Sequence, residues 1–172
     1  MNAFLKKWGG TAVMAAVVLI ALGVLGWRSW HVPEWDVEAL TLSEERETLP
    51  GLELTLDAEA APFGVTLLNG TDMVLESGAS VGSDPSVLIF TPGLDVLLDG
   101  NWYDVPCKDG ASAGVGLTLG PGEAVSGRGS LDGYGRLPDG EYRAVYGAYP
   151  PGERVGYGAY ARFRIEGGRV VV

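Results

Sequence analysis

Hydrophobic and polar positions divide the chain into an apolar segment near the amino terminus and a longer region of short, β-rich segments. Residues 8–27 contain no charged side chain. Beyond residue 51, no stretch of ten or more residues keeps the 3.6-residue period of an amphipathic helix, and Gly or Pro interrupts every candidate. The pattern predicts one amino-terminal helix followed by an all-β domain.

Turn dipeptides separate the expected strands. Pro fixes φ at about −65° and Gly permits a positive φ, so Pro-Gly and Asp-Gly pairs favour tight turns. Asp99-Gly100 lies between two β-rich runs and predicts a hairpin. Pro-Gly recurs at 50–51, 92–93, 121–122 and 151–152, and Asp-Gly at 99–100, 109–110, 132–133 and 139–140. The expected strands are 52–57, 64–68, 73–76, 87–90, 94–98, 102–106, 115–119, 123–131, 141–146 and 157–165.

Short strands at regular spacing are typical of an antiparallel β-sandwich, with a small closed barrel as the alternative because strand number does not separate the two. Tyr142 favours the sandwich. It follows Asp139-Gly140 at the start of a late strand, where immunoglobulin-like sandwiches place a tyrosine whose hydroxyl bonds to backbone upstream. The alternative for Tyr142 is an ordinary core tyrosine.

The apolar segment 8–27 has the length of a transmembrane helix. Twenty residues at about 1.5 Å each span about 30 Å, the thickness of the hydrocarbon core of a bilayer. Basic and tryptophan side chains flank it, as is typical of membrane boundaries. The expected flanking residues are Lys6, Lys7, Trp8, Trp27, Arg28 and Trp30.

The flanking charges favour a cytoplasmic amino terminus, which places the β domain outside the cytoplasm. The expected organisation is a short cytoplasmic tail (1–7), a transmembrane helix that acts as an uncleaved signal anchor (8–27), a juxtamembrane tether (28–50) and a β-sandwich domain (51–172). A cleaved signal peptide and a buried soluble helix are the alternatives for the apolar segment.

Charge and composition exclude several functions. The 172-residue chain has a net charge of −10, and all 22 acidic residues lie at or beyond Glu34. Nucleic-acid binding requires a basic surface, so it is excluded. The single His31 excludes a histidine-based triad within one chain, and the single Cys107 excludes an intrachain disulfide. Cys107 is either buried or available for an intermolecular bridge, and we expect it to be buried.

Motifs that suggest chemistry lack their required context. Gly110-Ala-Ser112-Ala-Gly114 resembles a nucleophile elbow, but a strand is expected after it and no histidine lies nearby. Gly156-x-Gly158-x-x-Ala161 precedes an alternating strand rather than the helix that a dinucleotide site needs. The acidic residues do not form a calcium loop. We therefore expect no catalytic residue, no cofactor and no metal site.

Tyrosines and glycines gather near the carboxyl terminus. Such a composition is typical of binding loops, because tyrosine offers a large rigid contact and glycine an adaptable backbone. The alternative is that these tyrosines pack on the sheet. The expected binding surface consists of Tyr146, Tyr149, Tyr157 and Tyr160, with Tyr134 nearby in the sequence.

Residues 41–166 resemble the bacterial immunoglobulin-like domains of extracytoplasmic proteins of Gram-positive bacteria. The resemblance rests on TLPGLELTLD, FGVTLLNGTD, LLDGNWYDVPCKDGA, LTLGPGE and LPDGEYRAVY, in that order. It implies a sandwich in which Trp102 packs in the core and Tyr142 holds a corner. It implies no catalytic residue.

These features predict a membrane-anchored extracytoplasmic module with a non-enzymatic binding or structural role in the bacterial cell envelope. The expected partners are the membrane, through the amino-terminal helix, and a protein or an envelope polymer. The alternative is a regulatory membrane protein whose outer domain senses or inhibits a protein partner, and loss of activity on removal of the anchor would distinguish it. The oligomeric state is not predicted.

Overall fold

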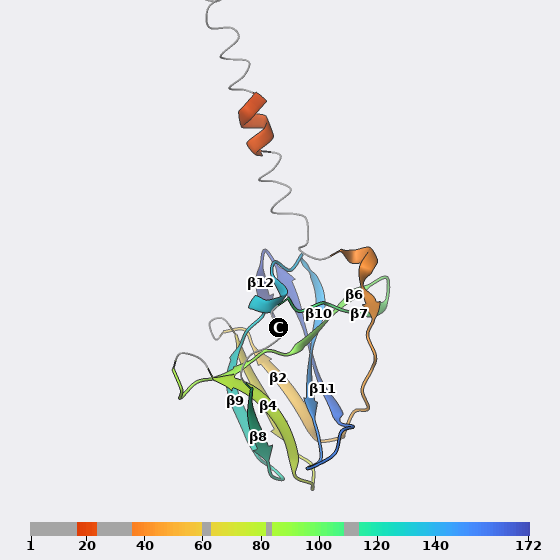
Figure 1. Cartoon of the computed structure of the whole chain (residues 1–172), viewed down its shortest axis with the longest axis vertical. Coiled ribbons are helices and arrows are strands. Elements are labelled where there is room, and N and C mark those ends of the chain that lie inside the picture. Colours follow the sequence, from red (N-terminus) through yellow and green to blue (C-terminus); the bar gives the residue numbers. More distant parts are fainter. Residues whose placement is uncertain (1–16, 24–35, 60–62, 82–83, 109–113) are drawn as a thin grey trace, which may run out of the picture. The chain divides into compact units, whose positions relative to one another are not determined.

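A computed structural model describes residues 17–23, 36–59, 63–81, 84–108 and 114–172 of the chain. Residues 17–23 are helical, and the β domain belongs to a separate unit that begins at Glu34 (Figure 1). No helix within the described residues is long and apolar enough to cross a membrane. The rest of the predicted segment 8–27 lies outside the described residues. So do its predicted flanking residues Lys6, Lys7, Trp8, Trp27, Arg28 and Trp30.

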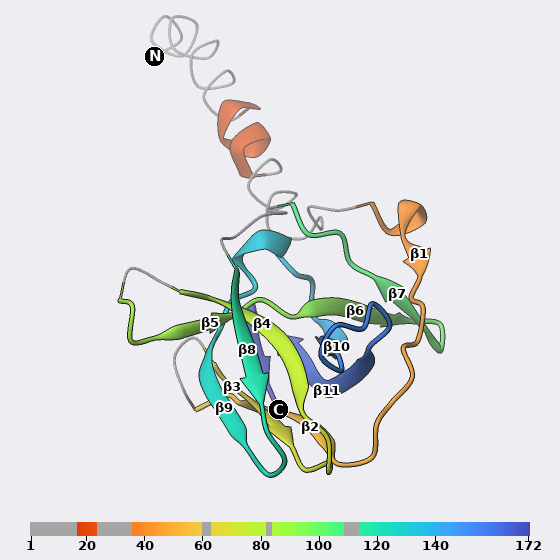
Figure 2. The same ribbon diagram turned by 60° about the horizontal axis from the view of Figure 1, so that its bottom comes forward.

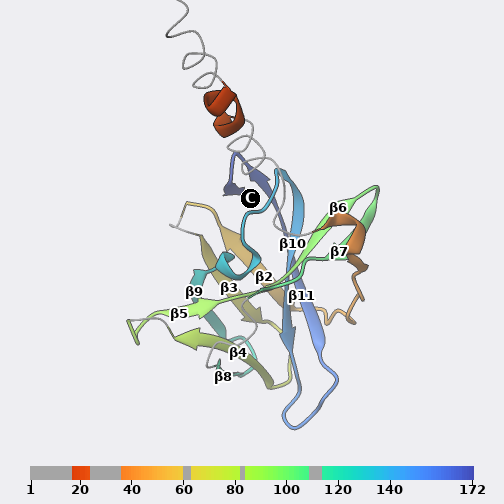
Figure 3. The same ribbon diagram turned by 45° about the horizontal axis from the view of Figure 1, so that its top comes forward.

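The β domain has two six-stranded sheets, which we call sheet A and sheet B. Sheet A has the order β1-β7-β6-β10-β11-β12, and all of its neighbouring strands are antiparallel. Its strands are β1 (Thr41–Leu42), β6 (Gly93–Leu98), β7 (Asn101–Asp104), β10 (Gly140–Ala148), β11 (Tyr157–Glu166) and β12 (Arg169–Val171). Two short 3-10 helices, η1 (Val37–Ala39) and η2 (Asp132–Tyr134), complete the described elements. The β10–β11 hairpin is the longest pairing and extends beyond the adjacent strands (Figure 3).

Sheet B has the order β2-β3-β9-β5-β4-β8, with β8 at one edge beside β4 (Figure 2). Its strands are β2 (Leu52–Asp57), β3 (Gly64–Asn69), β4 (Leu75–Val81), β5 (Leu88–Phe90), β8 (Gly114–Leu119) and β9 (Ala124–Gly129). Four of its five neighbouring pairs are antiparallel, whereas β5 and β9 pair in parallel. The two sheets form a sandwich-like arrangement, so the barrel alternative is wrong.

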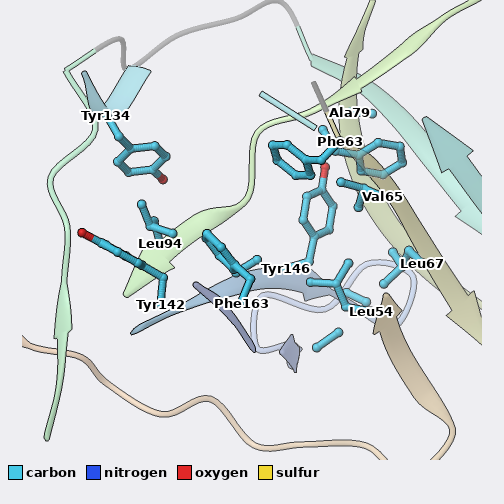
Figure 4. Packing of buried hydrophobic residues seen from close by; sticks show 14 of the residues in the cluster. Leu54, Phe63, Val65, Leu67, Ala79, Leu94, Tyr134, Tyr142, Tyr146 and Phe163 are labelled. Atoms are coloured by element: carbon cyan, nitrogen blue, oxygen red, sulfur yellow. The ribbon is translucent and has the colours of Figure 1, made fainter. Parts of the chain in front are cut away.

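Alternation within the strands builds the core. Paired residues of an antiparallel sheet share a face, and the register aligns Val96, Tyr142 and Phe163 across three strands of sheet A. All three are buried. The Tyr142 and Phe163 rings stack at 5.8 Å, and Figure 4 shows them among side chains from both sheets. Leu54, Val65 and Leu67 supply the facing surface from sheet B.

The predicted hairpin at Asp99-Gly100 is confirmed. Leu98 pairs with Asn101, and the two turn residues have φ values of 49° and 82°. Two successive positive φ angles are typical of the two-residue hairpin turn whose twist matches that of the flanking strands. This hairpin joins β6 to β7 and positions the side chains described below.

Candidate functional site

Arg143 lies near the centre of the outer face of sheet A, opposite the core. The register aligns it with Asp95 on β6 and with Arg162 on β11. Its Nε donates to Oδ2 of Asp95 at 2.7 Å, and its Nη1 donates to Oε1 of Glu45 at 2.9 Å. Only 6% of Arg143 and 3% of Asp95 are exposed. A buried ion pair on an outer face requires something to cover it.

Aromatic rings cover the Arg143 guanidinium. Its central carbon lies 4.7 Å from the centre of the Trp102 ring and 4.8 Å from the centre of the Tyr160 ring. Guanidinium groups are attracted to the negative faces of aromatic rings at such distances. The guanidinium of Arg162 also lies over Trp102, at 5.5 Å.

The expectation that Trp102 packs in the core is wrong. Trp102 pairs with Leu97 on the outer face, and the next residue, Tyr103, pairs with the buried Val96 and packs against the core. Two adjacent aromatic residues in a strand must point to opposite faces. Tyr103 occupies the inward position, and Trp102 is half-buried on the outer face.

Residues 43–47, which we call the strap, cross the outer face of sheet A. Ser43 donates its backbone N–H to the Trp102 carbonyl at 3.0 Å and its hydroxyl to Asp95 at 2.8 Å. Further along, the backbone N–H of Arg46 donates to the Tyr160 hydroxyl at 2.8 Å. The strap was expected within a tether over residues 28–50, but from Thr41 onward this segment is part of the β domain (Figure 1).

Burial and charge shift the pKa values of two groups at this site. Desolvation raises the pKa of Asp104, and the neighbouring Asp95 carboxylate raises it further. Burial alone would lower the pKa of Arg143, but its hydrogen bonds to Glu45 and Asp95 raise the pKa above the usual value. Arg143 is therefore a permanent positive charge that anchors the strap to the sheet.

A groove runs beside the strap and onto strand β4 of sheet B. Its first part is a hollow of about 600 Å³ between the strap and β6. A second hollow of about 290 Å³ shares Arg46, Gly93 and Val145 with the first. A third, of about 420 Å³, shares Ser77 and Tyr149 with the second. The hollows therefore adjoin one another through shared lining residues, and we call the three together the strap groove.

Gly147 leaves room for the Arg46 and Tyr149 side chains in the central part of this groove. A Cβ at this position would lie 2.4 Å from Nη1 of Arg46 and 3.0 Å from the Tyr149 hydroxyl. Without it, Nη1 of Arg46 donates to that hydroxyl at 3.2 Å. Backbone bonds between Glu76 and Tyr149, at 2.6 and 2.8 Å, fix the other side of the groove. These bonds therefore connect Arg46 of the strap to Tyr149 and Tyr149 to β4.

The four tyrosines of the expected binding surface do not form one surface. Tyr146 is directed into the core, where its hydroxyl donates to the Gly78 carbonyl and its ring packs on Phe90 at 5.3 Å (Figure 4). Tyr157 is half-buried against the core. Tyr149 lines the groove, and Tyr160 covers Arg143 beside it. Tyr157 and Tyr160 lie three positions apart on β11, so alternation directs them to opposite faces of sheet A.

Tyr142 and Tyr134 have structural hydrogen bonds. The Tyr142 hydroxyl donates to the Pro138 carbonyl, four residues upstream, at 2.8 Å. This is the geometry expected of a tyrosine that holds a corner. The buried Tyr134 hydroxyl donates to the Pro92 carbonyl at 2.7 Å. Both tyrosines therefore pin turns rather than bind a ligand.

Other candidate residues do not assemble a chemical site in the described part of the chain. Ser112 and His31 lie outside the described residues, and the segment after Ser112 forms strand β8. Gly156 and Gly158 lead into strand β11 rather than a helix. Cys107 was expected to be buried but is exposed, three residues beyond the end of β7, where the strand alternation no longer applies. Within the described ranges, no group of three metal-ligating side chains gathers.

The interactions among the strap, Asp95 and Arg143 were not predicted from the sequence, although the sequence holds a signal for the Asp95–Arg143 pair. Leu94-Asp95-Val96 and Tyr142-Arg143-Ala144 each place one charge between two inward residues. Two opposite charges at the same phase of neighbouring strands indicate a cross-strand pair. No such signal marks Ser43 or Glu45, which come from a distant segment.

Comparisons with models of known protein families, with curated protein sequences and with solved structures find no match for this chain. No residue role is inherited from a relative. The strap groove is therefore the candidate site on its own geometry, with a preformed wall, charges of both signs and a glycine-lined floor.

Proposed function

We propose that this chain is a membrane-anchored, extracytoplasmic binding module of the bacterial cell envelope, with an immunoglobulin-like sandwich and no enzymatic activity. The observation that carries the proposal is the strap groove, in which Arg46 bonds to Tyr149 and Tyr160, and Tyr149 bonds to Glu76 of β4. Contacts that already exist in the free protein lower the entropy cost of ordering side chains when a ligand binds. The corner bond of Tyr142 supports the immunoglobulin-like assignment.

The ligand that best suits the groove is an extended segment of a partner protein. The groove continues through three adjoining hollows, as an extended chain requires. One hollow is lined by four acidic residues and one arginine, and another by two acidic residues and one arginine. They are Glu44, Glu45, Asp95, Asp104 and Arg46 in the first, and Glu76, Glu153 and Arg154 in the second. Charged side chains of a polypeptide can pair with both signs, whereas a neutral polysaccharide cannot. A basic side chain of the ligand, placed near Asp104, would also relieve the repulsion between the carboxylates of Asp104 and Asp95.

Site-specific photo-cross-linking in intact cells tests this binding site. A photoreactive phenylalanine derivative replaces Tyr149 in the full-length chain, and Val172, exposed and outside the groove, provides the matched control. We expect a discrete adduct from position 149 and none from position 172. Replacing Arg46 by Glu in the same chain should reduce the adduct.

Two results would contradict the binding proposal. Equal cross-linking from positions 149 and 172, or none from either, would exclude a partner in the groove. A smear that collapses on digestion of the cell wall would identify an envelope polymer instead of a protein and would reject the proposed ligand class.

Membrane fractionation tests the proposed location. We expect the intact chain in the pellet after carbonate extraction and digestion of its β domain by protease added outside the cell. The amino-terminal mass distinguishes an anchor from a signal peptide. A soluble product that lacks residues 1–26 would show secretion and reject the anchor.

A further inference from the structure

A separate hollow, which is not part of the strap groove, lies at one end of the sandwich. Its volume is about 660 Å³, within the range of about 300–1,000 Å³ that is usual for small-molecule sites. Most of its wall is apolar. The apolar side chains come from both sheets and from the loop after β9, and they are Phe63, Ile89, Leu131, Leu137, Ile165 and Val170.

The shape of this hollow depends on a close approach in sheet B. Gly129 ends β9, and a Cβ there would lie 1.9 Å from the Phe63 ring. The ring therefore lies directly against the backbone of β9. The chain then leaves the sheet and passes through η2 to Leu137, forming the opposite wall. The result is an apolar hollow open to solvent on one side.

Arginines gather around this hollow in a domain that is otherwise acidic. Residues 31–172 hold nine Lys and Arg against 22 Asp and Glu, yet Arg128, Arg136 and Arg169 all line this one hollow. Two acidic residues, Glu59 and Asp132, also line it, and Asp132 accepts a hydrogen bond from the Ser130 hydroxyl at 3.0 Å. Arg128 and Arg169 are both exposed, and their side chains make no ion pair to the described residues within 4.0 Å.

We propose that this hollow binds a single-chain amphiphile with an anionic head group, such as a long-chain carboxylate. The hydrocarbon tail would displace water from the apolar wall, and the carboxylate would accept hydrogen bonds from Arg128 and Arg169. Guanidinium groups match carboxylates in charge and geometry. A small polar anion would leave the apolar wall exposed to water, and a neutral hydrocarbon would leave the arginines unused. This site is independent of the strap groove and of the proposed function.

Photo-labelling of the full-length chain tests the proposal. The protein is placed in phosphatidylcholine nanodiscs and labelled with a diazirine derivative of dodecanoic acid, and the labelled peptides are mapped by mass spectrometry. We expect label within residues 128–137 and 163–172. Dodecanoate should compete at a concentration at least tenfold lower than dodecanol or dodecyltrimethylammonium, because a hydrogen bond to a charged group contributes about tenfold or more.

Three variants separate the roles of charge and cavity. Arg128→Gln/Arg169→Gln should abolish the preference for dodecanoate over dodecanol but retain labelling. Val170→Trp should narrow the hollow and reduce labelling by all chains, with an unchanged unfolding transition as its control. Arg154→Gln, a matched change at an exposed arginine of the strap groove, should have no effect.

Two outcomes would overturn the proposal. The first is the absence of label from residues 128–137 and 163–172, or label there that Val170→Trp leaves unchanged. The second is equal competition by the anionic and cationic chains in the unaltered protein.

Discussion

Arg143 and Asp95 hold opposite charges where little water reaches them, since their side chains are 7% and 4% exposed. Removing one partner of a buried pair leaves an uncompensated charge and costs about 3–5 kcal/mol, whereas replacing both by apolar groups costs far less. We expect Arg143→Met to lower the free energy of unfolding by about 3 kcal/mol, and Asp95→Leu to lower it by less, because Glu45 still pairs with Arg143. The double variant should lose less than the sum. Urea unfolding at pH 7 measures all four proteins, and additive losses would contradict the coupling.

Buried tyrosines predict that the domain loses stability in alkali. Burial raises the pKa of Tyr146 to about 12, and it also raises the pKa values of Tyr134 and Tyr142. An unfolded tyrosine titrates at about 10. The folded state holds these protons more tightly, so the contribution of Tyr146 is complete below about pH 10 and is lost as the pH rises through about 12.

We therefore expect the free energy of unfolding to fall between about pH 10 and pH 12. The fall should be smaller in Tyr146→Phe, because the substituted residue has no proton to lose. Urea unfolding at a series of pH values measures both proteins. A difference between them that stays constant over this range would show that Tyr146 does not titrate with unfolding.

At the scale of elements, local pattern predicted most strands. Leu52–Asp57 was predicted with its observed bounds, because LELTLD alternates between buried and exposed positions and a Pro-Gly turn precedes it. Strand β4 was placed too early, at 73–76, because Gly78 hides the pattern of Leu75–Val81. Strands β1 and β12 were missed, since two or three residues carry too little pattern.

Glycine was interpreted as a turn residue, and this was only partly correct. Gly51, Gly122 and Gly152, the second residues of Pro-Gly pairs, have φ values between 77° and 92°. Gly127 and Gly129 instead lie within β9, where they leave room for the Phe90 and Phe63 rings. Sequence alone does not separate these roles, because the second depends on which side chain approaches from another strand.

Gly129 gives a direct test of this packing role. In Gly129→Ala, the added methyl group would overlap the Phe63 ring, and overpacking typically costs about 1–3 kcal/mol. We expect a loss of that size in urea unfolding. Gly116→Ala on β8 is the matched control, because no atom lies within 4 Å of the added Cβ. Equal effects of the two substitutions would show that contact with Phe63 is unimportant.

At the scale of the molecule, the boundary of the β domain was the feature that sequence placed wrongly. The segment before residue 51 contains Pro33, a Glu-Glu-Arg-Glu run and no sustained period, so it resembles a tether. Its described part is held by tertiary contacts instead, including the bond from Gly158 N–H to the Glu47 carbonyl at 2.8 Å. Such contacts leave no local periodicity, because each joins a strap residue to a distant strand.

Truncation distinguishes the two boundaries. A chain of residues 51–172 lacks Ser43 and Glu45 and so loses their bonds to Arg143 and Trp102, whereas a chain of residues 36–172 keeps the whole strap. Each lost hydrogen bond contributes about 0.5–1.5 kcal/mol. We expect the shorter chain to unfold with a Tm lower by about 10 °C, measured by circular dichroism, since about 3 kcal/mol corresponds to such a shift in a domain of this size.

The chain 51–172 lacks other residues besides the strap, so a control is needed. The double variant Ser43→Ala/Glu45→Gln in the chain 36–172 removes only the side-chain bonds of the strap and should show part of the decrease in Tm. Equal Tm values for the two truncated chains would place the boundary at residue 51 and make the strap dispensable.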